Sequence, residues 1–137
     1  MAVTPPFFEN NAGHLIEDQG GFLRVYWDNK GRTIADSQAL FAQMLMMLRR
    51  RNWGRILINQ VGMQPFTSEE QQWVAHEWLP KAVREGGYRF GAVVVSPQVL
   101  TRLATAYITT QVVGLPLTYR SFEEEREATA WLKQQLR

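Results

Sequence analysis

RILINQVGMQPFTSEE, residues 55–70, is the stretch of sequence that decides the fold. The run Ile56 to Asn59 is typical of a buried strand, and Gly62 and Pro65 predict a short loop after it. Thr67-Ser68-Glu69-Glu70 has the hydroxyl N-cap and the acidic first turn that begin a helix. Open α/β sheets bind their ligands where a strand ends in such a loop. We therefore expect an α/β fold with a binding site at this loop.

Toward the N-terminus, the sequence predicts antiparallel strands. Three short segments of strand-like composition, residues 7–10, 14–18 and 22–28, are separated by turns rich in Asn and Gly. We expect these segments to form an antiparallel meander. A disordered lead, residues 1–6, precedes it, because Pro5-Pro6 resists regular structure.

Toward the C-terminus, strands alternate with helices. Apolar spacing predicts strands at residues 55–60, 88–95 and 116–121, and helices at residues 33–51, from 68 onward, 98–108 and 123–136. We expect Pro80 to kink or interrupt the second helix. Strand–helix–strand units with short links imply parallel pairing. The sequence thus predicts a single α/β domain, residues 1–137, with a mixed sheet of about five strands (N-terminal antiparallel hairpins, then βαβ units) and four helices.

The composition is that of an ordinary globular protein, with 45% hydrophobic and 20% charged residues. The chain has no cysteine, which excludes disulfides and thiolate metal sites, and its two histidines form no ligand motif. We therefore predict no metal and no cofactor. A net charge of +2, spread along the chain, argues against nucleic-acid binding. No apolar run reaches the roughly 20 residues of a membrane span, and the N-terminus lacks the features of a signal peptide, so we expect a cytoplasmic protein.

No catalytic constellation is visible in the sequence. None of the four serines lies in a nucleophile-elbow pattern, and His14 and His76 fit surface or core-edge positions. Gly20-Gly21 and Gly86-Gly87 fit a hairpin turn and a helix end rather than a phosphate-binding loop. Arg49-Arg50-Arg51 contacts phosphates or, as we prefer, complements the dipole at a helix C-terminus. We therefore expect a protein that is not an enzyme.

Five residues around the central loop are our candidates for binding a partner or a ligand: Gln60, Gln64, Thr67, Ser68 and Trp73. The two hydroxyls also fit a plain N-cap, which is the commoner role of such residues. Ser68 and Thr67 are candidate phosphorylation sites, where a phosphate would gain from the helix N-terminus and suffer from the adjacent carboxylates. Trp73 lies off the apolar stripe of its helix, at the edge of the core or against a ligand or partner.

A second set of residues predicts an adaptable apolar pocket. Met44, Met63, Phe66 and Trp78 could line a site for a small apolar molecule, since methionine suits irregular and promiscuous surfaces. The same residues serve equally well as core filling. The alternative function is therefore a carrier or sensor of a small apolar ligand.

Scattered motifs extend over residues 14–136: W-x4-W-x-P at Trp73, Trp78 and Pro80, then Gly87, Ser96-Pro97, and F-x5-A-x2-W-L at Phe122, Ala128, Trp131 and Leu132. Together they resemble the SpoIIAA-like proteins of the STAS/SEC14 group, in particular a bacterial branch of uncharacterised single-domain members. The resemblance implies a STAS-like α/β sandwich with a regulatory or binding role rather than catalysis.

The resemblance also marks a position for a switch. Better-known STAS regulators carry a phosphorylated Ser, within an Asp-Ser motif, at the helix N-terminus after a central strand. Thr67 or Ser68 is the nearest match, but no Asp-Ser pair is present and Asn59 ends the strand where those regulators often have Asp. Lipid-binding relatives are much larger, so no lipid cavity is implied. We expect a non-enzymatic regulatory module that binds a protein partner or small ligand, with a homodimer as one form of partner.

Overall fold

The computed structural model describes residues 6–135 and contains a six-stranded mixed sheet. The strands lie across the sheet in chain order: β1 (Phe8–Glu9), β2 (Gly13–Asp18), β3 (Phe22–Trp27), β4 (Arg55–Asn59), β5 (Phe90–Val94) and β6 (Thr118–Phe122). β1 to β3 pair antiparallel, whereas β3 to β6 pair parallel. The predicted α/β class, with N-terminal antiparallel hairpins, is confirmed. All six segments that the sequence marks as strands lie in the sheet, the short β1 included, with Phe8 opposite Leu15.

The helices follow the parallel strands: α1 (Ile34–Arg51), a continuous run of α2 (Ser68–Trp73), η1 (Val74–Trp78) and α3 (Leu79–Gly86), then α4 (Val99–Thr110) and α5 (Glu125–Gln134). With α2, η1 and α3 counted as one rod, these are the four helices that the sequence predicts. Residues 1–5 and 136–137 lie outside the described residues, and with them most of the predicted lead and the last residue of the final predicted helix.

A π-helical turn accommodates Pro80. Proline has no N–H group, and its ring clashes with the carbonyl one turn earlier. In η1 the turn widens by one residue, so that the N–H of Leu79 donates to the carbonyl of Val74, five residues back, and α3 then begins around the proline. The predicted interruption of the α-helix at Pro80 thus takes the form of a π turn directly before the proline.

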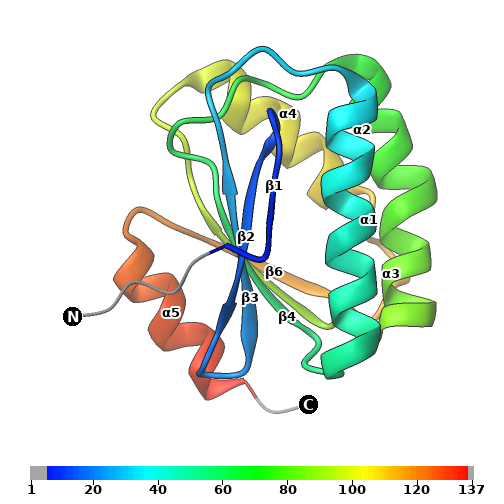
Figure 1. Ribbon diagram of the computed structural model, residues 1–137, viewed down its shortest axis with the longest axis vertical. Helices are drawn as coiled ribbons and strands as arrows, with labels where there is room; N and C mark the ends of the chain where they lie inside the picture. Colours follow the sequence, from blue (N-terminus) through cyan, green and yellow to red (C-terminus); the bar gives the residue numbers. More distant parts are fainter. Residues whose placement is uncertain (1–5, 136–137) are drawn as a thin grey trace.

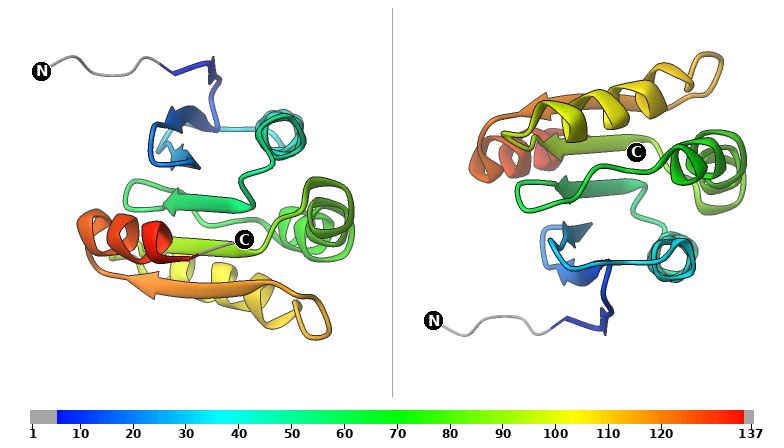
Figure 2. Two further views of the ribbon diagram at one scale, coloured as in Figure 1. Left: turned by 90° about the horizontal axis from the view of Figure 1, so that it is seen from below. Right: turned by 90° about the horizontal axis from the view of Figure 1, so that it is seen from above.

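Two unequal helical layers enclose the sheet, as Figures 1 and 2 show. α1, the α2–α3 rod and α4 lie on one face, and α5 lies alone on the other. Right-handed crossovers between parallel strands that are added in one direction place their helices on the same face. α5 follows the last strand and packs on the back of β4, β5 and β6. No helix of residues 6–135 is long and apolar enough to cross a membrane.

The larger core lies between the sheet and the three-helix layer, and it is aromatic. Trp27, Phe41, Phe66, Trp78 and Tyr88 form a chain of ring contacts with centroid distances of 4.7–6.3 Å. Such offset and edge-to-face pairs stabilise a core beyond the area they bury. The smaller core lies under α5 and contains Phe22, Leu57, Ala92, Val94, Ala128 and Leu132.

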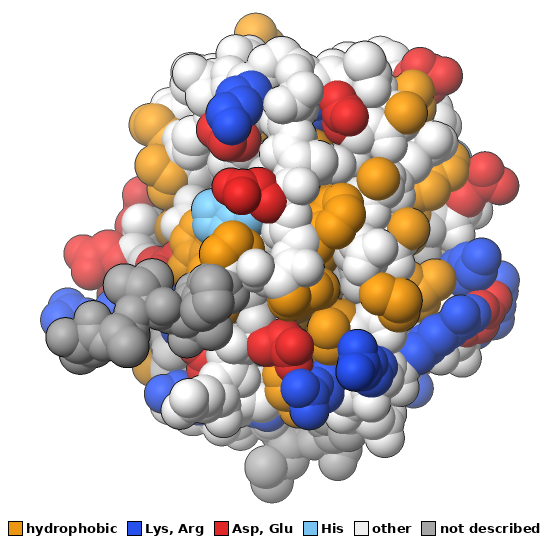
Figure 3. Space-filling model, viewed as in Figure 1, with side chains coloured by type: hydrophobic (Ala, Val, Ile, Leu, Met, Phe, Trp, Pro, Cys, Tyr) orange, Lys and Arg blue, Asp and Glu red, His pale blue; other side chains and the backbone are white. Residues whose placement is uncertain are grey.

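The arginine cluster at residues 49–51 lies in the last turn of α1, as its helix-end interpretation requires. Arg49 pairs with Glu85 of α3, and Arg51 pairs with Glu17 of β2 at 2.6 Å. Acidic and basic side chains lie next to each other at this end of the molecule in Figure 3. Two of the three arginines thus have a carboxylate partner within the chain.

Candidate functional site

A buried ion pair holds the loop between β4 and α2. The guanidinium of Arg32 donates to both carboxylate oxygens of Glu70, at 2.8 and 2.9 Å, and the two side chains are 5% and 2% exposed. Arg32 also donates to the carbonyls of Gln64 and Pro65, both at 3.2 Å. The hydroxyl of Ser37 on α1 donates to the same carboxylate. Arg32 therefore joins the loop to the first turn of α2 through its bidentate contact with Glu70, and Ser37 joins that turn to α1.

The environment of Glu70 keeps it ionised. Burial alone would raise the pKa of this carboxyl group, but hydrogen bonds from Arg32, Ser37 and the Thr67 N–H, together with the charge of Arg32, lower it below its ordinary value. The guanidinium of Arg32 lies 5.4 Å from the ring of Trp27 and 5.7 Å from that of Phe66. These aromatic faces add cation–π attraction and shield the pair from water.

This shift predicts a pH dependence of stability. Because the folded pKa of Glu70 lies below its unfolded value of about 4.5, its contribution is complete above that value and is lost as the pH falls through the folded pKa. We expect the difference in unfolding free energy between wild type and Glu70→Gln to stay constant between about pH 7 and pH 5 and to shrink below about pH 4. Urea unfolding followed by tryptophan fluorescence measures this, and a difference that does not change with pH would contradict it.

The five residues predicted to bind do not converge on one point. Gln64, Thr67 and Ser68 are exposed on the loop and at the start of α2. The hydroxyl of Thr67 accepts from the Glu70 N–H at 3.1 Å and so forms the N-cap, whereas the Ser68 hydroxyl makes no hydrogen bond to a described residue. Gln64 donates to Asn29 at 2.8 Å. The surface of the loop therefore gathers three of the five residues.

The other two lie away from that surface. Trp73 is half-buried and packs edge-on against Phe41 of α1, at a centroid distance of 5.7 Å. It lines a hollow between α1 and the α2–α3 rod. Gln60 points the opposite way, into the space beneath α4, and is only 3% exposed. Of the five, Gln60 alone reaches an internal cavity.

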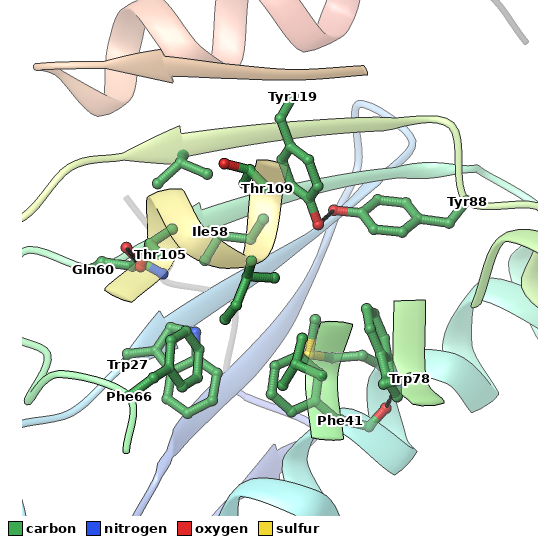
Figure 4. A pocket seen from close by; sticks show the side chains of 14 residues that line it. Trp27, Phe41, Ile58, Gln60, Phe66, Trp78, Tyr88, Thr105, Thr109 and Tyr119 are labelled. Atoms are coloured by element: carbon green, nitrogen blue, oxygen red, sulfur yellow. Dashed lines mark hydrogen bonds between the residues drawn. The ribbon is translucent and has the colours of Figure 1, made fainter. Parts of the chain in front are cut away.

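That cavity has a volume of about 40 Å³ and lies between the sheet, α1, η1 and α4 (Figure 4). Most of its wall is apolar, formed by residues such as Trp27, Phe41, Met44, Ile58, Phe66 and Trp78. Three of the four residues of the predicted apolar pocket, Met44, Phe66 and Trp78, are therefore neighbours in one wall. Met63 is buried elsewhere, where its carbonyl accepts from the hydroxyl of Thr101 at 3.2 Å.

Two tyrosines form a polar part of the wall. The hydroxyls of Tyr88 and Tyr119 point toward one another and are 3.1 Å apart (Figure 4). Burial raises the pKa of both phenols, and that of Tyr88 is raised further by Tyr119, so both stay protonated at neutral pH. Gly91 makes room for the pair, because a Cβ there would overlap the Tyr119 ring and lie 2.5 Å from the Tyr88 hydroxyl oxygen.

Gln60 and Thr105 form a second polar part. The Thr105 hydroxyl on α4 donates to the Gln60 side-chain carbonyl at 2.9 Å. The amide nitrogen of Gln60 makes no hydrogen bond to any residue among 6–135, although the side chain is almost fully buried. This nitrogen is not fully enclosed by protein, because it keeps contact with the space of the cavity, where water or a ligand can accept its hydrogen bond. The position is therefore suited to a ligand or a water that accepts this hydrogen bond.

A groove of about 360 Å³ adjoins the cavity, between α4 and the strands β5 and β6. The two spaces share Gln60, Val93, Thr105, Thr109 and Tyr119. The groove adds Val95, Arg102, Leu103, Ala106 and Ser121. We call the groove and the cavity together the α4 groove. One end of it, at Gln60 and Val95, lies at the carboxyl ends of β4 and β5, the edge at which open α/β sheets bind ligands.

The sequence predicted Gln60 and the apolar wall residues Met44, Phe66 and Trp78 of this site, but not the polar residues Thr105, Tyr88 and Tyr119. Thr105 lies 45 residues from Gln60 along the chain, and nothing in its own helix marks it. Gly91 is the residue from which part of the site could have been predicted, because an isolated glycine inside an apolar strand often marks a close approach of another group. That group is the ring of Tyr119.

The two histidines lie outside the α4 groove. His14 stacks on Tyr26 at 5.0 Å, and His76 is exposed on η1. Among residues 6–135, no group of three His, Cys, Asp or Glu side chains is placed to hold a metal ion.

Comparison with known proteins finds no family model, no curated sequence and no solved structure that matches the chain significantly.

Proposed function

We propose that this protein is a non-enzymatic, STAS/SpoIIAA-like binding module that takes a small ligand into the α4 groove. The observation that carries the proposal is Gln60, a residue only 3% exposed whose side-chain amide nitrogen faces the cavity and makes no hydrogen bond to the described residues. A ligand that accepts from its amide would complete the buried hydrogen bonding. At about 360 Å³, the groove has the size typical of small-molecule sites.

Binding without catalysis is supported by what surrounds the groove. The hydroxyls of Thr105, Thr109 and Tyr119 have no histidine or carboxylate beside them among the residues that line it. The raised pKa of Tyr88 and Tyr119 keeps these phenols from acting as bases near neutral pH. The site therefore offers hydrogen-bond donors and acceptors but no activated nucleophile. A cytoplasmic location remains part of the proposal.

The alternative, a carrier of a purely apolar molecule, has weaker support. A cavity of about 40 Å³ holds one or two waters and no larger apolar body. An apolar ligand would have to occupy the groove as well, where the hydroxyls of Thr105, Thr109 and Ser121 are part of the wall. A ligand with both apolar and polar parts fits this lining better.

Replacement of Gln60 tests the proposed site. Phenylbutanol, which joins an apolar body to one hydroxyl group, is titrated into nitrogen-15-labelled protein and followed by NMR. We expect shifts at Gln60, Thr105 and Tyr119, and a Kd that rises about tenfold in Gln60→Met, because methionine keeps the size and removes the amide. Gln43→Met, on α1 and outside the lining, should keep the wild-type Kd. Absence of saturable shifts, or equal affinity in Gln60→Met, would contradict the site.

Protein partners remain a second proposal, supported by one surface. Val99, Leu100 and Leu103 on α4 are 61–69% exposed, and the neighbouring β6 is the outer strand of the sheet. An unpaired strand beside apolar side chains favours association of two copies. Light scattering over a range of concentrations measures whether a homodimer forms.

Phosphorylation of Thr67 or Ser68 stays a prediction. The mass of the protein purified from its own cells would test it.

A further inference from the structure

The segment that builds the α4 groove contains no acidic residue. Between Gly86 and Phe122 the sequence has three arginines and neither Asp nor Glu. The residues from outside this segment that line the groove and the cavity, Gln60 and the apolar residues of the cavity wall, are all neutral. The nearest acidic residues along the chain are Glu85 and Glu123, at the segment's two ends. The walls of the groove therefore carry only positive charge, and a concave site of one sign attracts ligands of the other.

Arg102 is the arginine that faces the groove. Arg102, Thr105, Ala106 and Thr109 are spaced along one face of α4, and all four line the groove. The Arg102 guanidinium is exposed and makes no ion pair or hydrogen bond with any residue of the described chain. The positive charge of Arg102 therefore lies at the groove, and its guanidinium N–H groups are available to bind a ligand.

The other two arginines of the segment are engaged elsewhere. Arg120 lies over the ring of Phe122 at 5.3 Å, and Phe122 packs with the core under α5, on the opposite face of the sheet. Arg89 donates to the carbonyls of Val83 and Tyr88, at 3.4 and 2.9 Å. Of the three cations, Arg102 alone lines the groove.

We propose that the ligand of the α4 groove is a small carboxylate with an apolar body. This inference rests on the proposed function, that the groove binds a small ligand. The carboxylate pairs with Arg102, because the guanidinium fork matches two carboxylate oxygens. The apolar body lies along Val93, Val95 and Leu103, and the free amide of Gln60 donates to a polar group further along it. One arginine beside an apolar wall suits a monoanion, whereas a phosphate dianion is better matched by several cationic or N–H donors.

A pair of probes tests the charge preference. Phenylbutyrate and phenylbutanol share the same body and differ in the head group, so the ratio of their Kd values from NMR titration measures the preference for a carboxylate. We expect phenylbutyrate to bind about tenfold more tightly than phenylbutanol at low salt, and the advantage to fall as salt rises. Inorganic phosphate alone should not shift the groove resonances, and saturable phosphate binding there would overturn the carboxylate assignment.

Two arginine variants test whether the preference for a carboxylate depends on Arg102. Arg102→Gln should remove the advantage of phenylbutyrate and leave the affinity for phenylbutanol unchanged. Arg120→Gln removes one positive charge from the same segment on the other face of the sheet, and it should keep the full advantage. Equal loss in the two variants would mean a general charge effect and would overturn the role of Arg102. A wild-type Kd ratio near one would do the same.

The two proposals fail in different ways. Saturable binding of phenylbutanol that depends on Gln60, without preference for phenylbutyrate, sustains the proposed function and refutes the carboxylate ligand. If neither probe shifts the groove resonances, the proposed function itself fails. Urea unfolding of each variant shows whether a lost Kd reflects lost folding, since Arg102 and Arg120 are both exposed and their replacement should leave stability near wild type.

Discussion

Arg32→Met should lower the free energy of unfolding by about 3–5 kcal/mol, the largest effect we expect from one substitution at a charged residue of this protein. The guanidinium is 5% exposed and makes the bidentate contact with Glu70, so its removal leaves a carboxylate 2% exposed without its counter-charge. The carbonyls of Gln64 and Pro65 lose their donor at the same time. Urea unfolding at neutral pH measures the loss.

Two further variants separate charge from packing. The double substitution Arg32→Met with Glu70→Leu removes both charges, and we expect it to recover much of the stability, because an apolar pair can replace a buried ion pair at little net cost. Arg50→Met, on the exposed last turn of α1, is the matched control and should stay within about 0.5 kcal/mol of wild type. A double variant no more stable than Arg32→Met would show that the carbonyl contacts, not the unpaired carboxylate, dominate the loss.

Gly91→Ala should destabilise the protein by about 1–3 kcal/mol and disturb the α4 groove. The added methyl group overlaps the ring of Tyr119, which must turn away and give up its hydrogen bond to Tyr88. Because Tyr119 lines both the cavity and the groove, the same change should weaken phenylbutanol binding. Calorimetric unfolding and the NMR titration report the two effects.

Gly31→Ala is the control for this substitution. A Cβ at Gly31 meets nothing within 4 Å, so the substitution should be neutral or slightly stabilising. If Gly91→Ala were as stable as wild type and bound phenylbutanol equally well, the tyrosine pair would not depend on the absence of a side chain at residue 91.

Much of the fold follows from local signals in the sequence. The capping box at Thr33 and Asp36 begins α1, and Gly87 ends α3 in the left-handed conformation, with φ of 70°. Both features depend on residues within one helical turn of the boundary. Apolar runs and turn residues likewise place each strand. These elements were predictable because the interactions that define them join neighbours in the chain.

The candidate site was less predictable because its contacts join distant residues. Glu70 looks like an acidic residue of a first helical turn, yet it is buried because Arg32, 38 residues earlier, lies opposite it. The position of Gln60 at the end of β4 suggests a site, but its burial depends on α4. The hydroxyls of Thr67 and Ser68 were predicted to bind because of their place at the end of the loop. One of them forms the N-cap, and the other is exposed at the surface.

The order of the strands bears on how the chain is assembled during synthesis. Since each strand lies beside the one that precedes it in the sequence, every new strand finds its neighbour already in place as the chain leaves the ribosome. The back of the sheet is completed later. Its apolar residues Phe22, Leu57, Ala92 and Val94 are covered only when α5 packs Ala128 and Leu132 against them. A nascent chain that has reached β6 thus still exposes an apolar surface, and the final helix removes it.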